Sequence, residues 1–160
     1  MRLAVAMLVL LFSAIANAQA EQDDLAALDA AFAKGVLILK ASEYACHRLE
    51  VYVAQTPVQR ARGLMNIRHL PKMTGMLFVY DADAYLSMWM KNTFIPLDMF
   101  FIRADGTVSS IAYRTEPQSL ESLAALEPVR YVLELNAGMA EALSIDKYSR
   151  VEWDGMPIDE

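Results

Sequence analysis

The sequence predicts a mainly β fold of the α+β class, with two or three short helices and an antiparallel, partly closed β-barrel or sandwich. Several short segments rich in branched and aromatic side chains follow one another along the chain, and only short helical segments interrupt them. Successive strands with short connections favour antiparallel pairing, because a parallel pair needs a long crossover between its strands. This strand-rich order is typical of a sandwich or partly closed barrel.

The start of the chain has the pattern of a secretion signal. Arg2 precedes an apolar run over residues 3–12, and small residues lead to Ala18 and Ala20 in two A-x-A patterns. The run is shorter than the roughly 20 residues that a membrane-spanning helix needs. We therefore expect a periplasmic or secreted protein with no permanent membrane span after cleavage.

Three consecutive regions follow from this pattern. Residues 1–20 are predicted to be a cleaved signal peptide, residues 21–45 an N-terminal lead-in segment and residues 46–160 the β-rich domain. No repeat or second composition suggests an inner boundary, and the length remaining after cleavage suits one domain.

The first elements come from Ala- and Leu-rich and then alternating sequence. Residues 23–33 are expected to form a short helix that ends at Lys34 and Gly35. Residues 36–39 have the composition of a strand, and residues 49–53 alternate apolar and polar side chains as a half-buried strand does.

A short helix is predicted after residue 56. Thr56 is placed as its N-cap, Pro57 at its first position and Gln59 where a capping box takes Glu or Gln. Gly63 is expected to end it.

The remaining strands follow from Gly75. They are predicted over Gly75–Tyr80, Tyr85–Met90, Leu97–Ile102, Thr107–Tyr113, Tyr131–Leu135 and Arg150–Trp153. Asp105 and Gly106 favour a hairpin turn between two of them, and residues 115–128 are expected to form a long loop. Asn136 is predicted to cap a helix over residues 138–143.

The densest group of candidate site residues lies at 88–98. Pro96 favours a tight connection between two strands, which brings Trp89, Lys91 and Asn92 near one end and Asp98 at the start of the next strand. Asp98 stands in an apolar run, where a carboxylate needs a partner. It is either a ligand-binding or catalytic group, or a brace that accepts backbone N–H groups or pairs with Arg62 or Arg68.

Glu134 poses the same question inside a second apolar strand. If it faced Asp98, the two acids could act as general acid and base in a hydrolase. Alternation along the strand favours the other interpretation, in which Glu134 points to solvent.

Metal and cofactor chemistry has little support. Met88 and Met90 would share one face of a strand. Because thioethers bind soft metals, a Cu(I) site formed by these two residues is a minor alternative. His47 and His69 lack metal-ligand spacing, so neither a zinc site nor a cofactor is expected. The chain has no G-x-S-x-G, P-loop or G-x-G-x-x-G motif, which argues against the enzyme classes that these motifs mark.

The charge balance bears on partners. The chain has 14 Lys and Arg against 20 Asp and Glu, a formal net charge of −6. Such a surface is unsuited to nucleic acid or anionic lipid.

Five blocks of sequence, in order, resemble the DUF192 family. They are Val53–Thr56, Arg60–Met65, Gly75–Phe78, Trp89–Asp98 and Val132–Gly138. The resemblance covers about residues 49–153 and implies a compact, mostly β, barrel-like domain that is often exported; it implies no particular activity.

Three functional hypotheses remain. The leading one is an exported, envelope-associated module that binds a small polar or saccharide-like ligand, with Trp89 as a stacking platform and polar contacts from Lys91, Asn92, Asp98, Glu134 and Arg62. The alternatives are a hydrolase that uses the carboxylate pair and a structural protein that docks an envelope component.

Overall fold

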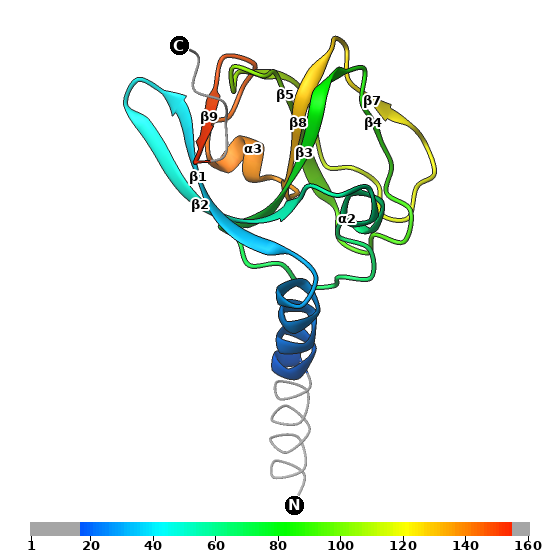
Figure 1. Ribbon diagram of the computed structural model, residues 1–160. Helices are drawn as coiled ribbons and strands as arrows, with labels where there is room; N and C mark the ends of the chain where they lie inside the picture. Colours follow the sequence, from blue (N-terminus) through cyan, green and yellow to red (C-terminus); the bar gives the residue numbers. More distant parts are fainter. Residues whose placement is uncertain (1–16, 155–160) are drawn as a thin grey trace, which may run out of the picture.

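A seven-stranded sheet forms the body of the domain in the computed structural model, which describes residues 17–154 (Figure 1). Its order is β6-β5-β8-β3-β2-β1-β9. The strands are β1 (Ala33–Ser42), β2 (Ala45–Ala54), β3 (Thr74–Ala84), β5 (Leu97–Ile102), β6 (Val108–Ala112), β8 (Val129–Asn136) and β9 (Arg150–Trp153). A separate pair joins β4 (Ser87–Met88) to β7 (Leu123–Ala124).

Three helices accompany the sheet: an N-terminal helix over residues 17–29, α2 (Pro57–Arg62) and α3 (Met139–Ala142). Within residues 17–154, no helix combines the length and the apolar character required to cross a lipid bilayer. Most of the predicted signal peptide, residues 1–16, lies outside the described part of the chain.

The mainly β, α+β architecture is as predicted, but the sheet is mixed rather than antiparallel. β2 and β3 run parallel, with Val51 opposite Gly75 and Val53 opposite Leu77. The reason is the connection through α2, which carries the chain back to the end of the sheet where β2 began. The other strand pairs are antiparallel.

The sheet curls into an open half-barrel. Its two edge strands approach each other at one end, where Thr107 and Arg150 form an isolated bridge and the Val108 N–H donates to the Ser149 carbonyl at 2.9 Å. Elsewhere these edges remain apart, so the predicted closure is limited to this contact.

Apolar side chains cover both faces of the curled sheet, which creates two cores. On the inner face, α3 lies in the hollow between β9 and β8 (Figure 1) and packs against side chains from β1, β2, β5 and β9. On the outer face, the N-terminal helix and the chain around β4 and β7 cover Met76, Phe78, Met99 and Val132. Consequently β5 is buried along its whole length, where an exposed antiparallel sheet would show alternation.

α2 forms as the sequence predicts. The Gln59 N–H donates to the Thr56 hydroxyl at 3.2 Å, and the Gln59 side chain accepts from the Thr56 N–H at 3.1 Å, completing the capping box. Gly63 ends the helix with φ +47°, and a Cβ there would lie 3.1 Å from the Phe78 ring. The helix end therefore sits directly on β3.

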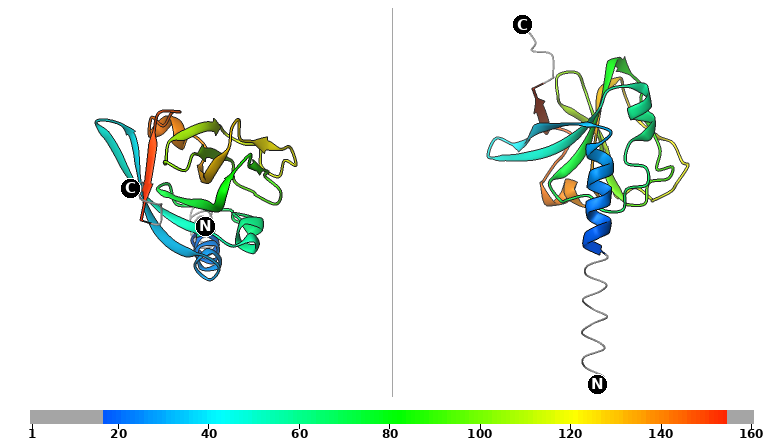
Figure 2. Two further views of the ribbon diagram at one scale, coloured as in Figure 1. Left: turned by 45° about the horizontal axis from the view of Figure 1, so that its top comes forward. Right: turned by 60° about the horizontal axis from the view of Figure 1, so that its bottom comes forward.

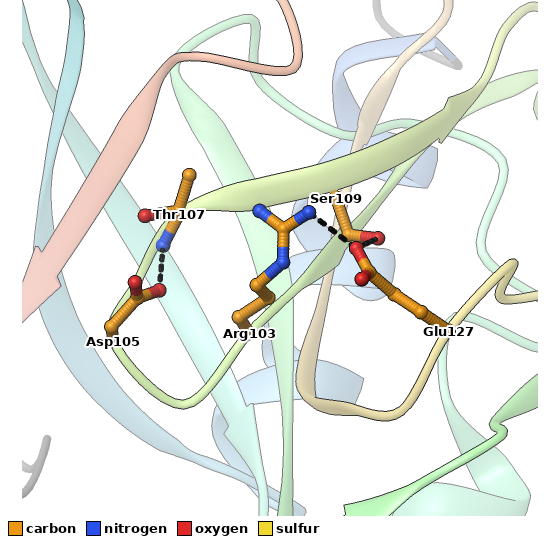
Figure 3. Close-up of polar contacts among 5 residues, drawn as sticks. All are labelled: Arg103, Asp105, Thr107, Ser109 and Glu127. Atoms are coloured by element: carbon orange, nitrogen blue, oxygen red, sulfur yellow. Dashed lines mark hydrogen bonds and ion pairs between the residues drawn. The ribbon is translucent and has the colours of Figure 1, made fainter.

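The predicted hairpin joins β5 and β6. Asp105 accepts the Thr107 N–H at 2.8 Å, and this bond is the main cause that lowers the pKa of Asp105; Gly106 takes φ +86° (Figure 3). Beside the turn, Glu127 accepts from both Arg103 and Ser109, which ties the β7–β8 connection to the hairpin (Figure 3).

The N-terminal helix joins the fold through its C-terminal half. It projects from the body of the domain (Figure 1 and Figure 2), and Leu28 and the following Phe32 are buried in the outer core. Asp24 accepts the N–H groups of Arg68 and His69, each at 2.8 Å. The region predicted as a lead-in segment, residues 21–45, thus includes β1, which lies between β2 and β9.

Two local predictions are wrong. Asn136 belongs to β8 and its side chain donates to the Leu70 carbonyl at 2.8 Å, so it does not cap α3; Gly138, with φ +87°, stands at that helix start. The strand predicted over residues 85–90 is reduced to the two residues of β4, because β7 offers a partner only to these.

Candidate functional site

The pocket on the outer face of the sheet is the candidate site. It has a volume of about 350 Å³ and lies between α2, β3 and the chain from β4 to Thr93. Its lining residues are Pro57, Arg60, Ala61, Arg62, Gly63, Leu64, Met65, Phe78, Tyr80, Ser87, Met88, Trp89, Lys91, Thr93 and Glu134. Four predicted site residues from three separate parts of the sequence therefore meet here: Arg62, Trp89, Lys91 and Glu134.

Glu134 is a buried acid that faces this pocket. It is 4 % exposed and stands between Met76 of β3 and Met99 of β5 in the sheet register. Among residues 17–154, no side chain or backbone group forms a hydrogen bond or ion pair with its carboxyl group. Burial among these apolar neighbours raises the pKa of Glu134 to about 8. The expectation that Glu134 points to solvent is wrong, because both faces of β8 are covered.

Tyr80 and Arg60 stand beside the acid. Burial raises the pKa of Tyr80; the Arg60 charge opposes this effect and the Glu134 charge adds to it. The Tyr80 hydroxyl has one weak contact, with the Met88 sulfur at 3.9 Å. The Arg60 guanidinium lies 4.7 Å from the Tyr80 ring centroid and donates to the Val79 carbonyl at 2.8 Å and to the Gln55 carbonyl.

Trp89 and Lys91 form the rim of the pocket. The Trp89 side chain is 51 % exposed, and the Lys91 ammonium lies 5.1 Å from its ring centroid. An exposed aromatic ring next to a flexible cation offers a ligand both a stacking surface and a charge.

Asp98 occupies the other face of the sheet. In the β5–β8 register, Asp98 is opposite Leu135, whereas Met99 is opposite Glu134, so the two acids point to opposite faces. Asp98 is 0 % exposed and accepts the N–H groups of Arg114 and Ala140, each at 2.8 Å. It joins β5 to α3 and to the chain after β6, and it pairs with neither Arg62 nor Arg68.

Asn92 and Arg62 have structural contacts as well. Asn92 takes a left-handed backbone conformation with φ +56°, its carbonyl accepts the Asn66 N–H at 2.9 Å, and its side chain does not line the pocket. Arg62 contributes to the lining, but its guanidinium donates to the Ala27 carbonyl at 3.0 Å and lies over Phe32. Its charge therefore stabilises the N-terminal helix.

The two methionines of the copper hypothesis are separated. Met88 lines the pocket, whereas the buried Met90 sulfur accepts a hydrogen bond from the Thr115 hydroxyl at 3.1 Å. Within residues 17–154, no three His, Cys, Asp or Glu side chains gather around one point as metal ligands would.

Comparison with known proteins identifies the family. The family model DUF192, described as "Uncharacterized ACR", matches residues 37–153. The chain belongs to the DUF192 family. The matched range begins inside β1 and ends at the last residue of β9, so this family domain contains most of the sheet, the inner core and the pocket, whereas Leu28 and Phe32 of the outer core precede it.

Two solved structures resemble this DUF192 chain. A proposed transcription regulator from Sinorhizobium meliloti 1021 is 41 % identical, with a TM-score of 0.77 over 78 % of this chain and 97 % of that one. A protein of unknown function from Novosphingobium aromaticivorans DSM 12444 is 33 % identical, with a TM-score of 0.71 over 74 % of this chain and 84 % of that one. The comparison with curated proteins finds no match.

Sequence reasoning missed Tyr80, Thr93 and the role of Arg60 in the DUF192 pocket. Arg60 and Arg62 are two residues apart on α2, so they lie on different faces of the helix and point to Tyr80 and Phe32 respectively. What the sequence could not supply is the face of the sheet that α2 covers. That depends on the parallel crossover from β2 to β3.

Proposed function

We propose that this protein is an exported, envelope-associated binding module for a small polar, saccharide-like ligand, which it holds in the pocket between α2, β3 and β4. The observation that carries the proposal is Glu134: a buried carboxyl group that has no hydrogen-bond partner among residues 17–154 and that faces a pocket of about 350 Å³. Burying such a group without a hydrogen bond is costly, so a ligand that supplies one gains affinity.

The rim of the pocket suits a sugar-like molecule. Trp89 offers an exposed aromatic face, and Arg60, Lys91 and Thr93 surround it with polar groups. Pockets that combine an aromatic surface with a few converging polar groups are typical small-molecule sites. The proposed location outside the cytoplasm rests on the sequence pattern of residues 1–20.

Binding is favoured over hydrolysis because the required pair of acids is missing from the pocket. A two-carboxylate glycosidase needs its acids within about 5–10 Å of each other. Of the residues that the structure describes, Glu134 is the one acid in the pocket lining, and Asp98 points to the other face of the sheet.

Truncation of Trp89 tests the proposal. A panel of envelope saccharides is titrated into the wild type and into Trp89→Ala, with binding followed by saturation-transfer NMR. We expect at least one saccharide to bind the wild type and to lose about tenfold or more in affinity on Trp89→Ala, since one aromatic stacking contact contributes about 1–3 kcal/mol.

Tyr85→Ala is the matched control, because Tyr85 is also an exposed aromatic residue but does not line the pocket. Equal loss in both variants, or no binding to the wild type, would contradict the proposal.

A second candidate function is protein docking. Trp89 and Leu120 line one shallow hollow beside β4, and both are exposed. An exposed apolar surface of this kind suits a protein partner. If docking is the main role, Leu120→Glu abolishes capture of an envelope protein and leaves saccharide titrations unchanged.

DNA binding, which the name of the Sinorhizobium protein suggests for that protein, is not proposed here. The formal net charge of −6 opposes contact with phosphates.

A further inference from the structure

We propose that the pocket selects an anionic saccharide of the uronic acid class, whose carboxylate lies against Arg60 and Lys91 and whose hydroxyl oxygens accept a hydrogen bond from the Glu134 carboxyl group. This inference rests on the proposed function and adds the charge of the ligand to it.

The cations of the pocket have no acidic partners among residues 17–154. In the described part of the chain, Arg103, Arg114 and Arg130 each form an ion pair with a carboxylate. Arg60 instead donates to two carbonyl groups, and Lys91 lies over the Trp89 ring. In a chain with a formal net charge of −6, two cations without carboxylate partners at one pocket favour an anion there.

The carboxyl group of Glu134 does not cancel the preference of the pocket for an anion. The charged or titratable groups that face it are Tyr80 from β3, Arg60 and Arg62 from α2, and Lys91 from the chain after β4; β5 contributes Met99. Because burial raises its pKa to about 8, Glu134 is mainly protonated at neutral pH and can donate a hydrogen bond. A neutral acid beneath two cations leaves the pocket positive.

The same arrangement makes binding depend on pH. Above pH 8 the Glu134 carboxyl ionises, so it stops donating and repels an anion. If the anion binds only the protonated form, its apparent Kd rises about tenfold between pH 7 and pH 9. Burial raises the pKa of Tyr80, so that hydroxyl stays neutral over this range.

Three saccharides that differ in charge provide the test. Glucuronate, glucose and glucosamine are titrated at pH 6 into a Trp153→Phe protein, in which Trp89 is the remaining tryptophan and its fluorescence is the readout. We expect affinity to fall in the order glucuronate, glucose, glucosamine.

Two variants and a matched control separate the roles of the residues. Lys91→Met is expected to lower glucuronate affinity about two- to fivefold, as the loss of an exposed ion pair does, and to lower glucose affinity by a smaller factor. Lys147→Met is the control, because Lys147 lies at the same 5.1 Å from an aromatic ring, that of Tyr148, outside the pocket. Glu134→Gln keeps a donor at the same position and should bind glucuronate equally at pH 7 and pH 9.

The outcomes distinguish the two proposals. Preference for glucosamine or glucose over glucuronate overturns this inference and leaves the proposed function standing. Binding of none of the three overturns both. A wild-type pH profile that matches Glu134→Gln, with both proteins shown to be folded by thermal melting, overturns the role assigned to Glu134.

Discussion

Asp98 and Glu134 are buried acids on neighbouring strands, yet their surroundings differ completely. Asp98 accepts two backbone N–H groups, whereas Glu134 has no hydrogen-bond partner in the described part of the chain. One acidic side chain thus braces the inner core, whereas the other faces a pocket on the outer face of the sheet. Replacing each acid by its amide should therefore affect stability in different ways. Asp98→Asn removes a structural hydrogen bond, whereas Glu134→Gln removes a buried ionisable group.

The first prediction concerns Asp98→Asn. The amide keeps one acceptor but turns an NH₂ group toward a backbone N–H, so one of two charge-assisted bonds is lost in a buried place. We expect a loss of about 2 kcal/mol in the free energy of unfolding, measured by urea denaturation. Asp105→Asn, in the exposed hairpin turn, should cost little because Asn also suits that position; equal losses would contradict the role of Asp98.

The second prediction concerns the pH dependence of stability. A carboxyl group whose pKa rises from 4.5 in the unfolded chain to about 8 in the folded protein binds more protons when folded, so its contribution to stability falls as pH rises between these values. The full change is on the order of 5 kcal/mol. Glu134→Gln should remove this slope, and urea denaturation from pH 5 to pH 9 measures it. A slope that persists in the variant would contradict the prediction.

At the scale of residues, the sequence indicated much of the site but not its geometry. Trp89, Lys91 and Glu134 were predicted, and all three line the pocket. Asp98 could not be separated from them, because which face a strand residue occupies depends on register and on what covers each face. The alternation of side chains along β8 predicted a solvent-exposed Glu134. That prediction is wrong for the same reason, since both faces of β8 are covered.

At the scale of elements, the approach of β3 to β8 depends on Gly75. A Cβ at this position would lie 2.5 Å from the Glu134 carbonyl oxygen and 2.5 Å from the Leu135 side chain. Backbone cannot yield as a side chain can, so the two strands would have to separate.

The third prediction follows from this contact. Gly75→Ala should lower the free energy of unfolding by about 1–3 kcal/mol, as overpacking does, measured by thermal or urea denaturation. Gly35→Ala is the matched control in β1, where the new Cβ meets the Trp153 side chain at 3.0 Å near the sheet edge. We expect a smaller cost there; the reverse order would be inconsistent with a close β3–β8 approach.

Strands and caps were largely predictable from local sequence. The bounds of β5 and β9 are those predicted, and the capping box of α2 forms. The parallel pairing of β2 and β3 was missed, although the helix between them was predicted. Local patterns show that a strand exists, whereas its partner is decided by how the intervening helix packs.

At the scale of the whole molecule, the N-terminal helix is part of the fold rather than an appendage. Leu28 and Phe32 are buried, and Asp29 accepts a hydrogen bond from Tyr52 at 2.7 Å. All of these contacts follow residue 20, the last residue of the predicted signal peptide. Cleavage there would leave them intact.

The fourth prediction compares two shortened chains. A protein that begins at Glu21 should unfold at the same urea concentration as the full chain. One that begins at Ala33 loses Leu28 and Phe32 from the outer core and should be less stable by at least about 4 kcal/mol. Equal stability of all three proteins would show that the helix does not contribute to the fold.

The place of β9 has a consequence for the order of events during synthesis. β1 pairs with β2 on one side, but its other side, from Leu37 to Lys40, pairs only with β9. While a ribosome makes the chain, that edge has no partner in this sheet until residues 150–153 have been translated. An open strand edge invites pairing with other chains. The nascent domain therefore exposes one side of β1 to other chains until β9 emerges and completes the sheet.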